Sequence, residues 1–122
     1  MTLNEYQKKA MSTCMDSCRN YSYMMDNLMS EVGEFAGKVA KAKRKNQVRF
    51  SEGGDLICTF DTMEEVGQFL NELKKEAGDI LWQLAGLCEV MEWDLEDVGQ
   101  GNLDKLASRQ RRGVIDGQGD NR

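Results

Sequence analysis

Apolar residues recur at helical spacing along most of the chain and divide it into four predicted helices. Intervals of three and four residues define helices over about 3–18, 22–45, 63–92 and 94–112. Capping-box sequences begin at Thr2 and Thr62, directly before the first and third helices. We therefore predict an all-α, four-helix bundle-like fold in which the long second and third helices are antiparallel.

Two segments depart from the helical pattern. Residues 46–61 contain two short apolar runs around the turn-forming sequence Ser51-Glu52-Gly53-Gly54-Asp55, which predicts a small β-hairpin or a loop insert. Because this insert has no helical period, we expect it to lie outside the core. Residues 114–122 are polar and contain glycine, so we predict one domain over 1–113 followed by a flexible tail.

The two long helices each carry a broad apolar seam. The seam of the second helix consists of Met25, Leu28, Val32, Phe35, Val39 and Ala42, and that of the third of Val66, Leu70, Leu73, Ala77, Ile80, Leu84, Leu87 and Met91. These arcs are wide enough to pack on more than one partner helix, so we expect self-association to a homodimer or a homotetramer.

Composition narrows the possible functions. The 122 residues include no histidine, which excludes Ser-His-Asp and Cys-His catalysis, Cys₂His₂ zinc sites and Glu-x-x-His di-iron centres. The net charge of −5 does not favour binding to nucleic acid. No run is apolar enough to span a membrane and the N-terminus does not resemble a signal peptide, so we expect a cytoplasmic protein with reduced cysteines.

Two acidic motifs in the long helices match each other. Glu31-Val32-Gly33-Glu34-Phe35 and Glu76-Ala77-Gly78-Asp79-Ile80 both read acid, small apolar, glycine, acid, apolar. A glycine within a helix costs about 1 kcal/mol relative to alanine, so its repetition indicates close approach of a backbone or a ligand. Acids three residues apart share one helix face.

The spacing brings the two motifs level in an antiparallel pair. Glu31 lies about 21 Å before the end of its helix and Glu76 about 20 Å after the start of the next, at 1.5 Å per residue. Four carboxylates at one height repel one another unless a cation neutralises them. We therefore expect Glu31, Glu34, Glu76 and Asp79 to bind Mg²⁺ or Mn²⁺, the alternative being two solvated helix faces.

These motifs resemble those of the MazG-like, all-α nucleoside triphosphate pyrophosphatases. The similarity extends over residues 22–112 and includes Asn102-Leu103-Asp104-Lys105-Leu106, where the family carries an Asn-x-x-Lys motif, with Arg109 following. The resemblance implies Mg²⁺-dependent hydrolysis of a nucleoside triphosphate to a monophosphate and pyrophosphate. It also points to a homo-oligomer.

The remaining candidate residues have both functional and structural interpretations. Lys38, Lys105 and Arg109 either offset phosphate charge or are surface cations, and Trp82 either stacks on a base or packs in the core. Asn102 either contacts the substrate or caps local structure, and one carboxylate, for which Glu34 is our candidate, accepts the proton of the attacking water. The alternative function is a non-catalytic helical oligomerisation module, which would need the seams but not the acids.

Overall fold

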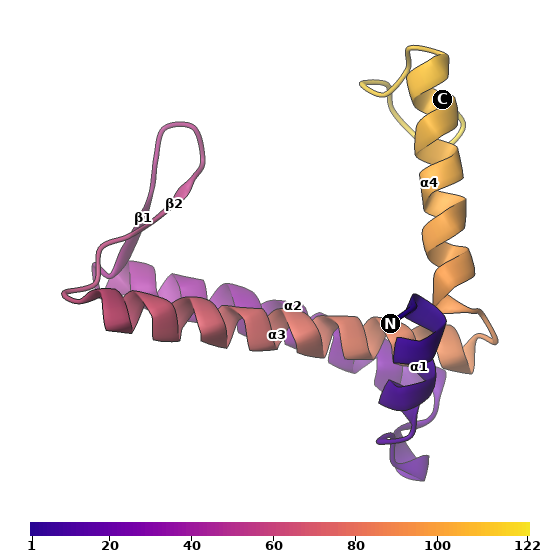
Figure 1. Ribbon diagram of the computed structural model, residues 1–122, viewed down its shortest axis with the longest axis horizontal. Coiled ribbons are helices and arrows are strands. Elements are labelled where there is room, and N and C mark those ends of the chain that lie inside the picture. Colours follow the sequence, from indigo (N-terminus) through magenta and orange to yellow (C-terminus); the bar gives the residue numbers. More distant parts are fainter.

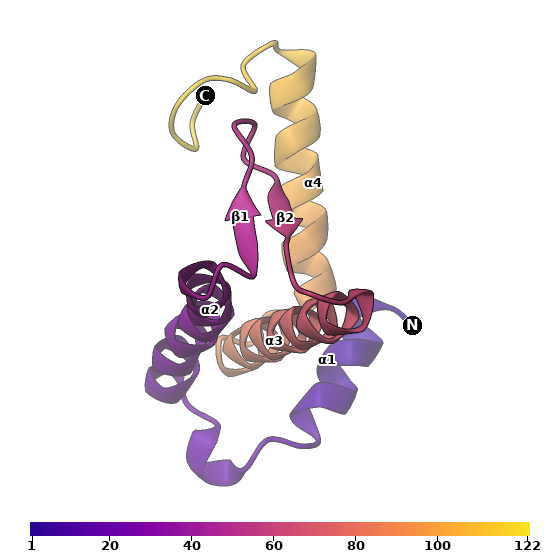
Figure 2. The same ribbon diagram turned by 90° about the vertical axis from the view of Figure 1, so that its left-hand side faces the viewer.

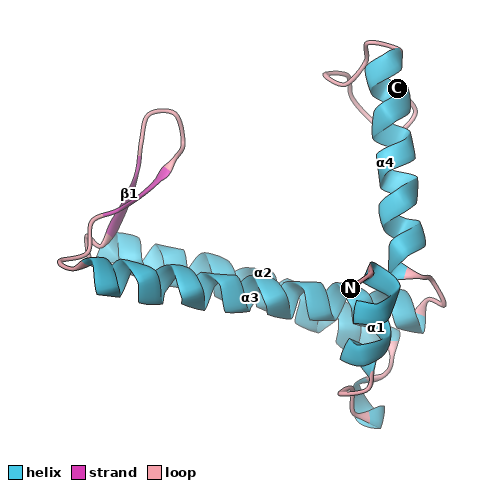
Figure 3. Cartoon of the chain, in the orientation of Figure 1, coloured by secondary structure: helices cyan, strands magenta, loops and turns pink.

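The computed structural model describes residues 1–122 and is mostly helical. Its elements are α1 (Leu3–Met11), the short 3-10 helix η1 (Asp16–Cys18), α2 (Tyr21–Arg44), β1 (Val48–Phe50), β2 (Leu56–Cys58), α3 (Met63–Val90) and α4 (Leu95–Arg111). Figure 3 shows that strand structure is confined to the segment between the two long helices. The predicted helical fold is therefore confirmed, and the 46–61 insert is a β-hairpin.

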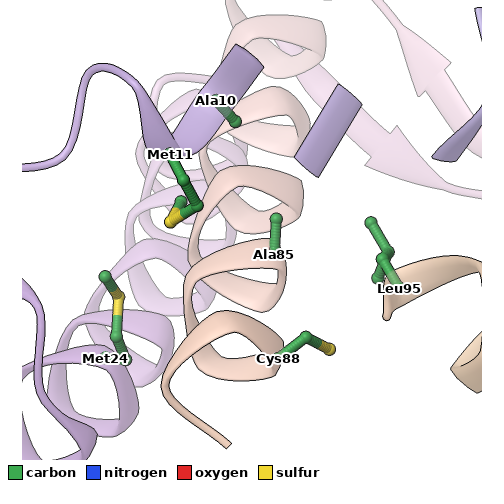
Figure 4. Close-up of a cluster of buried hydrophobic side chains, with 6 residues drawn as sticks. All are labelled: Ala10, Met11, Met24, Ala85, Cys88 and Leu95. Carbon is green, nitrogen blue, oxygen red and sulfur yellow. The ribbon is translucent and has the colours of Figure 1, made fainter. Parts of the chain in front are cut away.

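The centre of the molecule is a rod formed by α2 and α3, which lie antiparallel and side by side (Figures 1 and 2). A hydrophobic cluster holds each end of this rod. The cluster near the start of α2 also receives side chains from α1 and α4 (Figure 4), and it consists of Ala10, Met11, Met24, Ala85, Cys88 and Leu95. The cluster at the hairpin end consists of Ala42, Val48, Phe69 and Leu73.

The first helix is shorter than predicted, because α1 ends at Met11 rather than near residue 18. The hydroxyls of Ser12 and Thr13 donate hydrogen bonds to the carbonyls of Lys9 and Ala10, each at 2.6 Å. Such side-chain bonds to the backbone compete with helix continuation. The apolar spacing up to Cys18 therefore does not belong to one continuous helix, although Ala10 and Cys14 both pack at the cluster near the start of α2.

The hairpin contradicts our expectation that the whole insert lies outside the core. The strands pair Val48 with Cys58 and Phe50 with Leu56. Val48 is buried in the cluster at the hairpin end of the rod, with Cys58 packed against it. Phe50 and Leu56, nearer the tip, are exposed. The base of the hairpin thus belongs to the core, and the tip does not.

The apolar seams are covered only in part by the pairing of α2 and α3, although Ala42 and Leu73, one from each seam, share a buried cluster. Val32 of α2 and Leu70 of α3 are each 47% exposed. Only 14 of 122 residues are buried, which is few for a chain of this length. At about 100° per residue, each seam is centred to one side of the polar positions along which α2 and α3 meet, so its near edge is covered and its far edge is exposed. Rotation in the same sense on antiparallel helices brings both seams to one side of the rod, which we call the apolar face.

Helix α4 forms an arm that rises away from the end of the rod, on the same side as the hairpin (Figures 1 and 2). It begins after the turn at Glu92, which has a φ of 58°. Its contacts with the rest of the chain are mainly with α1. None of the helices combines the length and the apolar composition that crossing a bilayer requires.

Candidate functional site

A polar stripe occupies the line along which α2 and α3 meet. From α2 it contains Asn27, Glu31, Glu34 and Lys38, and from α3 Gln83, Asp79, Glu76 and Glu72. The register is fixed at both ends of this stripe. Lys38 pairs with Glu72 at 3.9 Å, and Met24 lies over Gly86. The polar residues that share one face of each helix through i, i+3 and i+4 spacing therefore face each other across the rod.

Three carboxylates converge at the middle of the stripe. Glu31, Glu34 and Glu76 each offer an oxygen atom within 4.8 Å of the others. Asp79 is not part of this close group. Burial, followed by the negative charges of Glu34 and Asp79, raises the pKa of Glu31. Like charges held this closely favour either a shared proton or a cation.

The chemistry of these donors fits a hard divalent cation. All are carboxylate oxygens, the ligand type that Mg²⁺ and Mn²⁺ prefer. Oε2 of Glu76 is buried and has no hydrogen-bond partner, although buried polar atoms are normally paired. An oxygen left unpaired beside two further carboxylates is available as a ligand. We call Glu31, Glu34, Glu76 and Asp79 the acid centre.

Lys38 lies beside the acid centre. Its Nζ is 3.3 Å from Oε1 of Glu76, and its side chain is 38% exposed. The ammonium group therefore neutralises part of the centre while it keeps access to solvent. A ligand that carries phosphate groups and approaches Glu76 from solvent would meet this cation.

The two motif glycines do not serve the close approach that we expected of them. A Cβ at Gly33 or Gly78 would have no atom within 4 Å. Each glycine lies two residues after an acid of the stripe, about 200° around the helix, and so on the side away from the partner helix. The close approach occurs instead at Gly86, where a Cβ would lie 2.4 Å from Sδ of Met24.

Two amides extend the stripe beyond the acids, and our sequence reasoning did not select either as a site residue. Nδ2 of Asn27 donates to Oε1 of Glu31 at 3.3 Å. Gln83 is 3% exposed, and its Oε1 is buried without a partner. The signal was present in the sequence, since both amides continue the spacing of the acid motifs.

Trp82 contacts α1 and not the acid centre. Its indole Nε1 donates to the carbonyl of Ala10 at 3.1 Å and to Oγ1 of Thr13 at 3.0 Å. These contacts support packing in the core, rather than stacking on a base, as the role of Trp82. Helix α1 instead brings Tyr6 towards the acids. Burial, and then the charge of Asp79, raises the pKa of Tyr6.

The arm carries Asn102, Lys105 and Arg109, which do not meet the acid centre of the same chain. Lys105 lies ten residues into α4, about 15 Å along the arm at 1.5 Å per residue. Asp79 lies eleven residues before the end of α3, about 16 Å back along the rod. Because arm and rod diverge (Figure 1), these distances do not cancel.

The cations of the arm contact the C-terminal tail. Nζ of Lys105 and Nη2 of Arg109 lie 3.4 Å and 3.1 Å from Oδ1 of Asp120. Asn102 is exposed and makes no side-chain hydrogen bond. Asp120 was not among our candidate residues, because the glycine-containing tail has no periodic pattern that would place it on α4.

Comparison with known proteins extends over nearly the whole chain. Residues 19–114 match the MazG nucleotide pyrophosphohydrolase domain. The gene 37 protein of Mycobacterium phage L5 is 37% identical over 107 residues, which cover 88% of this chain and 81% of the phage protein. No solved structure matches the chain. The acid motifs, the helical fold and these matches together show that the chain belongs to the MazG nucleotide pyrophosphohydrolase family.

Proposed function

We propose that this protein hydrolyses a nucleoside triphosphate to the monophosphate and pyrophosphate, with Mg²⁺ or Mn²⁺ bound at the acid centre. The observation that carries the proposal is the convergence of Glu31, Glu34 and Glu76 within 4.8 Å, in a chain of the MazG family. Asp79, on the same stripe, completes the set of ligands. When bound, the cation supplies charge neutralisation for the triphosphate and a lowered pKa for water.

Within this set, Glu34 is our candidate for the general base. It is exposed, whereas Glu31 and Glu76 are half-buried. A carboxylate that faces solvent can accept the proton of an incoming water and release it again. Glu31 and Glu76, which are held by neighbouring side chains, are better suited to a fixed ligand role.

Lys38 is our candidate for the first phosphate contact. Because its ammonium group lies beside Glu76 and remains partly exposed, a phosphate that approaches the acid centre meets a positive charge there. Lys105 of the arm would provide a second contact, and Asn102 is placed one helical turn before it.

The arm and the acid centre would meet in an assembly of two or more copies. The apolar face exposes Val32 and Leu70 of the seams, and Met29 and Leu81 of the same two helices are exposed as well, all more than a third accessible. Burying such a surface against a second rod would complete a four-helix bundle. The arm of one copy could then carry Lys105 towards the acid centre of another, which a single chain does not allow.

A panel of nucleoside triphosphates tests the proposed reaction. With Mg²⁺ present, we expect one or more members to yield a monophosphate and pyrophosphate, and product analysis in ¹⁸O-labelled water verifies hydrolysis. Orthophosphate as the first product would contradict the proposal and indicate an ordinary phosphatase. The same panel without divalent cations should give no products.

Subunit mixing tests the shared site. We expect Glu76→Gln and Lys105→Ala to be inactive or nearly so when assayed alone. Co-refolding the two variants should restore about a quarter of wild-type activity, because half of the random dimers carry one intact site out of two. Mixtures that remain inactive would show that each chain uses its own arm.

A further inference from the structure

The last nine residues fold back along the end of the arm (Figures 1 and 2). Gly113 and Gly119 take φ values of 70° and 76°, a region that favours glycine, and these two residues turn the chain. Nη2 of Arg112 donates to the carbonyl of Arg122 at 2.6 Å, and Nε of Arg122 donates to the carbonyl of Val114 at 3.1 Å. The tail is thus closed onto the arm from both of its ends.

Arg109 anchors this tail. Its side chain is only 5% exposed, and its Nη2 donates to the main-chain carbonyls of Gly119 and Asp120 as well as to the carboxylate of Asp120. A guanidinium this deeply covered is not free to bind a phosphate. It can instead hold a carboxylate in one position, because an arginine side chain stays charged and presents several hydrogen-bond donors in fixed directions.

The carboxylate of Asp120 joins two cations of different exposure. Lys105 is 41% exposed and reaches the same Oδ1 atom as the buried Arg109, which lies one helical turn further along α4. One negative charge is therefore shared between two positive charges. The contact with Asp120 holds the ammonium group of Lys105 in place. Because Arg109 also balances the charge of Asp120, the positive charge of Lys105 is not fully neutralised and can attract a further anion.

The surroundings of this triad favour an anion. Between residues 105 and 122 the chain carries five Lys or Arg residues and two Asp residues, although its net charge is −5. Positive charge is thus concentrated in the last turns of α4 and in the tail, far from the acids of the rod, whereas the first part of α4 carries Glu96, Asp97 and Asp104. In an assembly that brings this surface to the acid centre of another copy, a polyphosphate bound there would present its remaining negative charge to it.

We propose that Asp120 is a positioning residue that holds the ammonium group of Lys105 ready for a substrate phosphate, with Arg109 as its buried anchor. The proposal rests on the proposed function, in which Lys105 contacts the triphosphate. A lysine side chain has many rotamers, and restraining it before the substrate arrives lowers the entropic cost of the contact. In this proposal the tail contributes to substrate binding, because it carries the carboxylate that positions Lys105.

A double-mutant cycle tests this role. Hydrolysis of the best triphosphate in the panel is measured for the wild type, Asp120→Asn, Lys105→Ala and the double variant, with Asp116→Asn as the control. Asp116 is an exposed tail acid that makes no ion pair or side-chain hydrogen bond, so its variant removes the same charge without the contact. We expect Asp120→Asn to lower kcat about tenfold and Asp116→Asn to leave it unchanged.

The inference predicts that the two substitutions are not additive. In the Lys105→Ala background, Asp120→Asn should change kcat by less than about twofold, since no lysine remains to be positioned. Asp120→Glu should recover part of the lost rate, which separates positioning from simple loss of fold. Additive effects would overturn the inference and assign Asp120 a purely structural role.

Binding of inorganic pyrophosphate by isothermal titration gives a second readout, independent of turnover. We expect Asp120→Asn to weaken it several-fold, and only when Lys105 is present. Tighter pyrophosphate binding in Asp120→Asn would show instead that the tail carboxylate competes with phosphate, and would overturn the inference. A wild type that binds pyrophosphate but hydrolyses no triphosphate would remove the proposed function while the binding cycle still tests the positioning role.

Discussion

The acid centre of the rod and the cations at the end of the arm carry opposite charges and are built in different ways. The acid centre arises from two long helices whose i, i+3 and i+4 positions face each other along the rod. The arm is a single helix whose cations are arranged by a folded tail, through Asp120. The first depends on helix pairing and the second on a few local contacts. We therefore expect substitutions in the two regions to affect metal binding, phosphate binding and stability separately.

The largest expected effect is on the acid side of this comparison. Glu76→Gln should lower activity at least ~100-fold and weaken Mg²⁺ binding, because it removes a carboxylate that lies within 4.8 Å of two others. In metal-free buffer its Tm should not fall, since like-charge repulsion is relieved. A turnover assay checks the activity, titration calorimetry the Mg²⁺ binding, and a thermal melt the Tm. Glu52→Gln, in the exposed hairpin turn, is the matched control.

The arm side should respond through turnover and phosphate binding, and not through stability or metal affinity. Lys105→Ala should cut kcat up to about 100-fold, because a cation is most needed when phosphate charge is redistributed in the transition state. Its Tm and its Mg²⁺ affinity should match those of the wild type, since the side chain is 41% exposed and lies away from the acid centre. Lys9→Ala, at an exposed position of α1, is the control. Full activity in Lys105→Ala would remove the arm from the site.

Two glycines offer a paired test of how firmly each region is held. Gly86→Ala places a Cβ 2.4 Å from Sδ of the fully buried Met24, so it should destabilise the rod by about 1–3 kcal/mol. Gly117→Ala places a Cβ 2.7 Å from Cδ of Arg122 and 3.1 Å from the carbonyl of Val114. It should release the tail while changing global stability by less than about 0.5 kcal/mol. Denaturant unfolding and NMR spectra of the tail separate the two outcomes.

The smallest effect is a pH response confined to the arm. Hydrogen bonding to Arg109, with the charge of Lys105, lowers the pKa of Asp120 below its usual 3.8. The ionised carboxylate therefore holds the tail above that value, and its contribution is lost as the pH falls through the lowered folded-state pKa. NMR shifts of Gly117 and Gly119 between about pH 2 and pH 6 should report this release. In Asp120→Asn, the transition should be absent from the shifts of Gly119.

The acid centre could be predicted from the sequence because a helix converts residue spacing directly into a shared face. Glu31 with Glu34 and Glu76 with Asp79 need only correct helices and an approximate depth to come level. The orientation of the seams could not be predicted in the same way. A seam shows that one side of a helix is apolar but not which element covers that side, and Val32 and Leu70 remain exposed within one chain.

The helix of the arm was predicted at 94–112 and is α4, Leu95–Arg111, but the contacts of the tail with this helix could not be predicted, for a different physical reason. The contact of Asp120 with Arg109 depends on left-handed backbone at two glycines and on hydrogen bonds between arginines and carbonyls. These are local, aperiodic interactions with no pattern to reveal them. The early end of α1 has a similar origin, since the bonds of Ser12 and Thr13 to the backbone outweigh the apolar spacing that continues to Cys18.

The placement of the two hydrophobic clusters at opposite ends of the rod has a consequence for local opening. The middle of a long helix is usually its most protected part, because fraying starts at the ends. Here the ends are held by Met24 and Cys88 on one side and by Phe69 and Leu73 on the other, while carboxylates occupy the middle. Amide hydrogens near Glu31 and Glu76 should therefore exchange with solvent faster than those at either cluster. Mg²⁺ binding, which stabilises only the closed rod, would reverse that order.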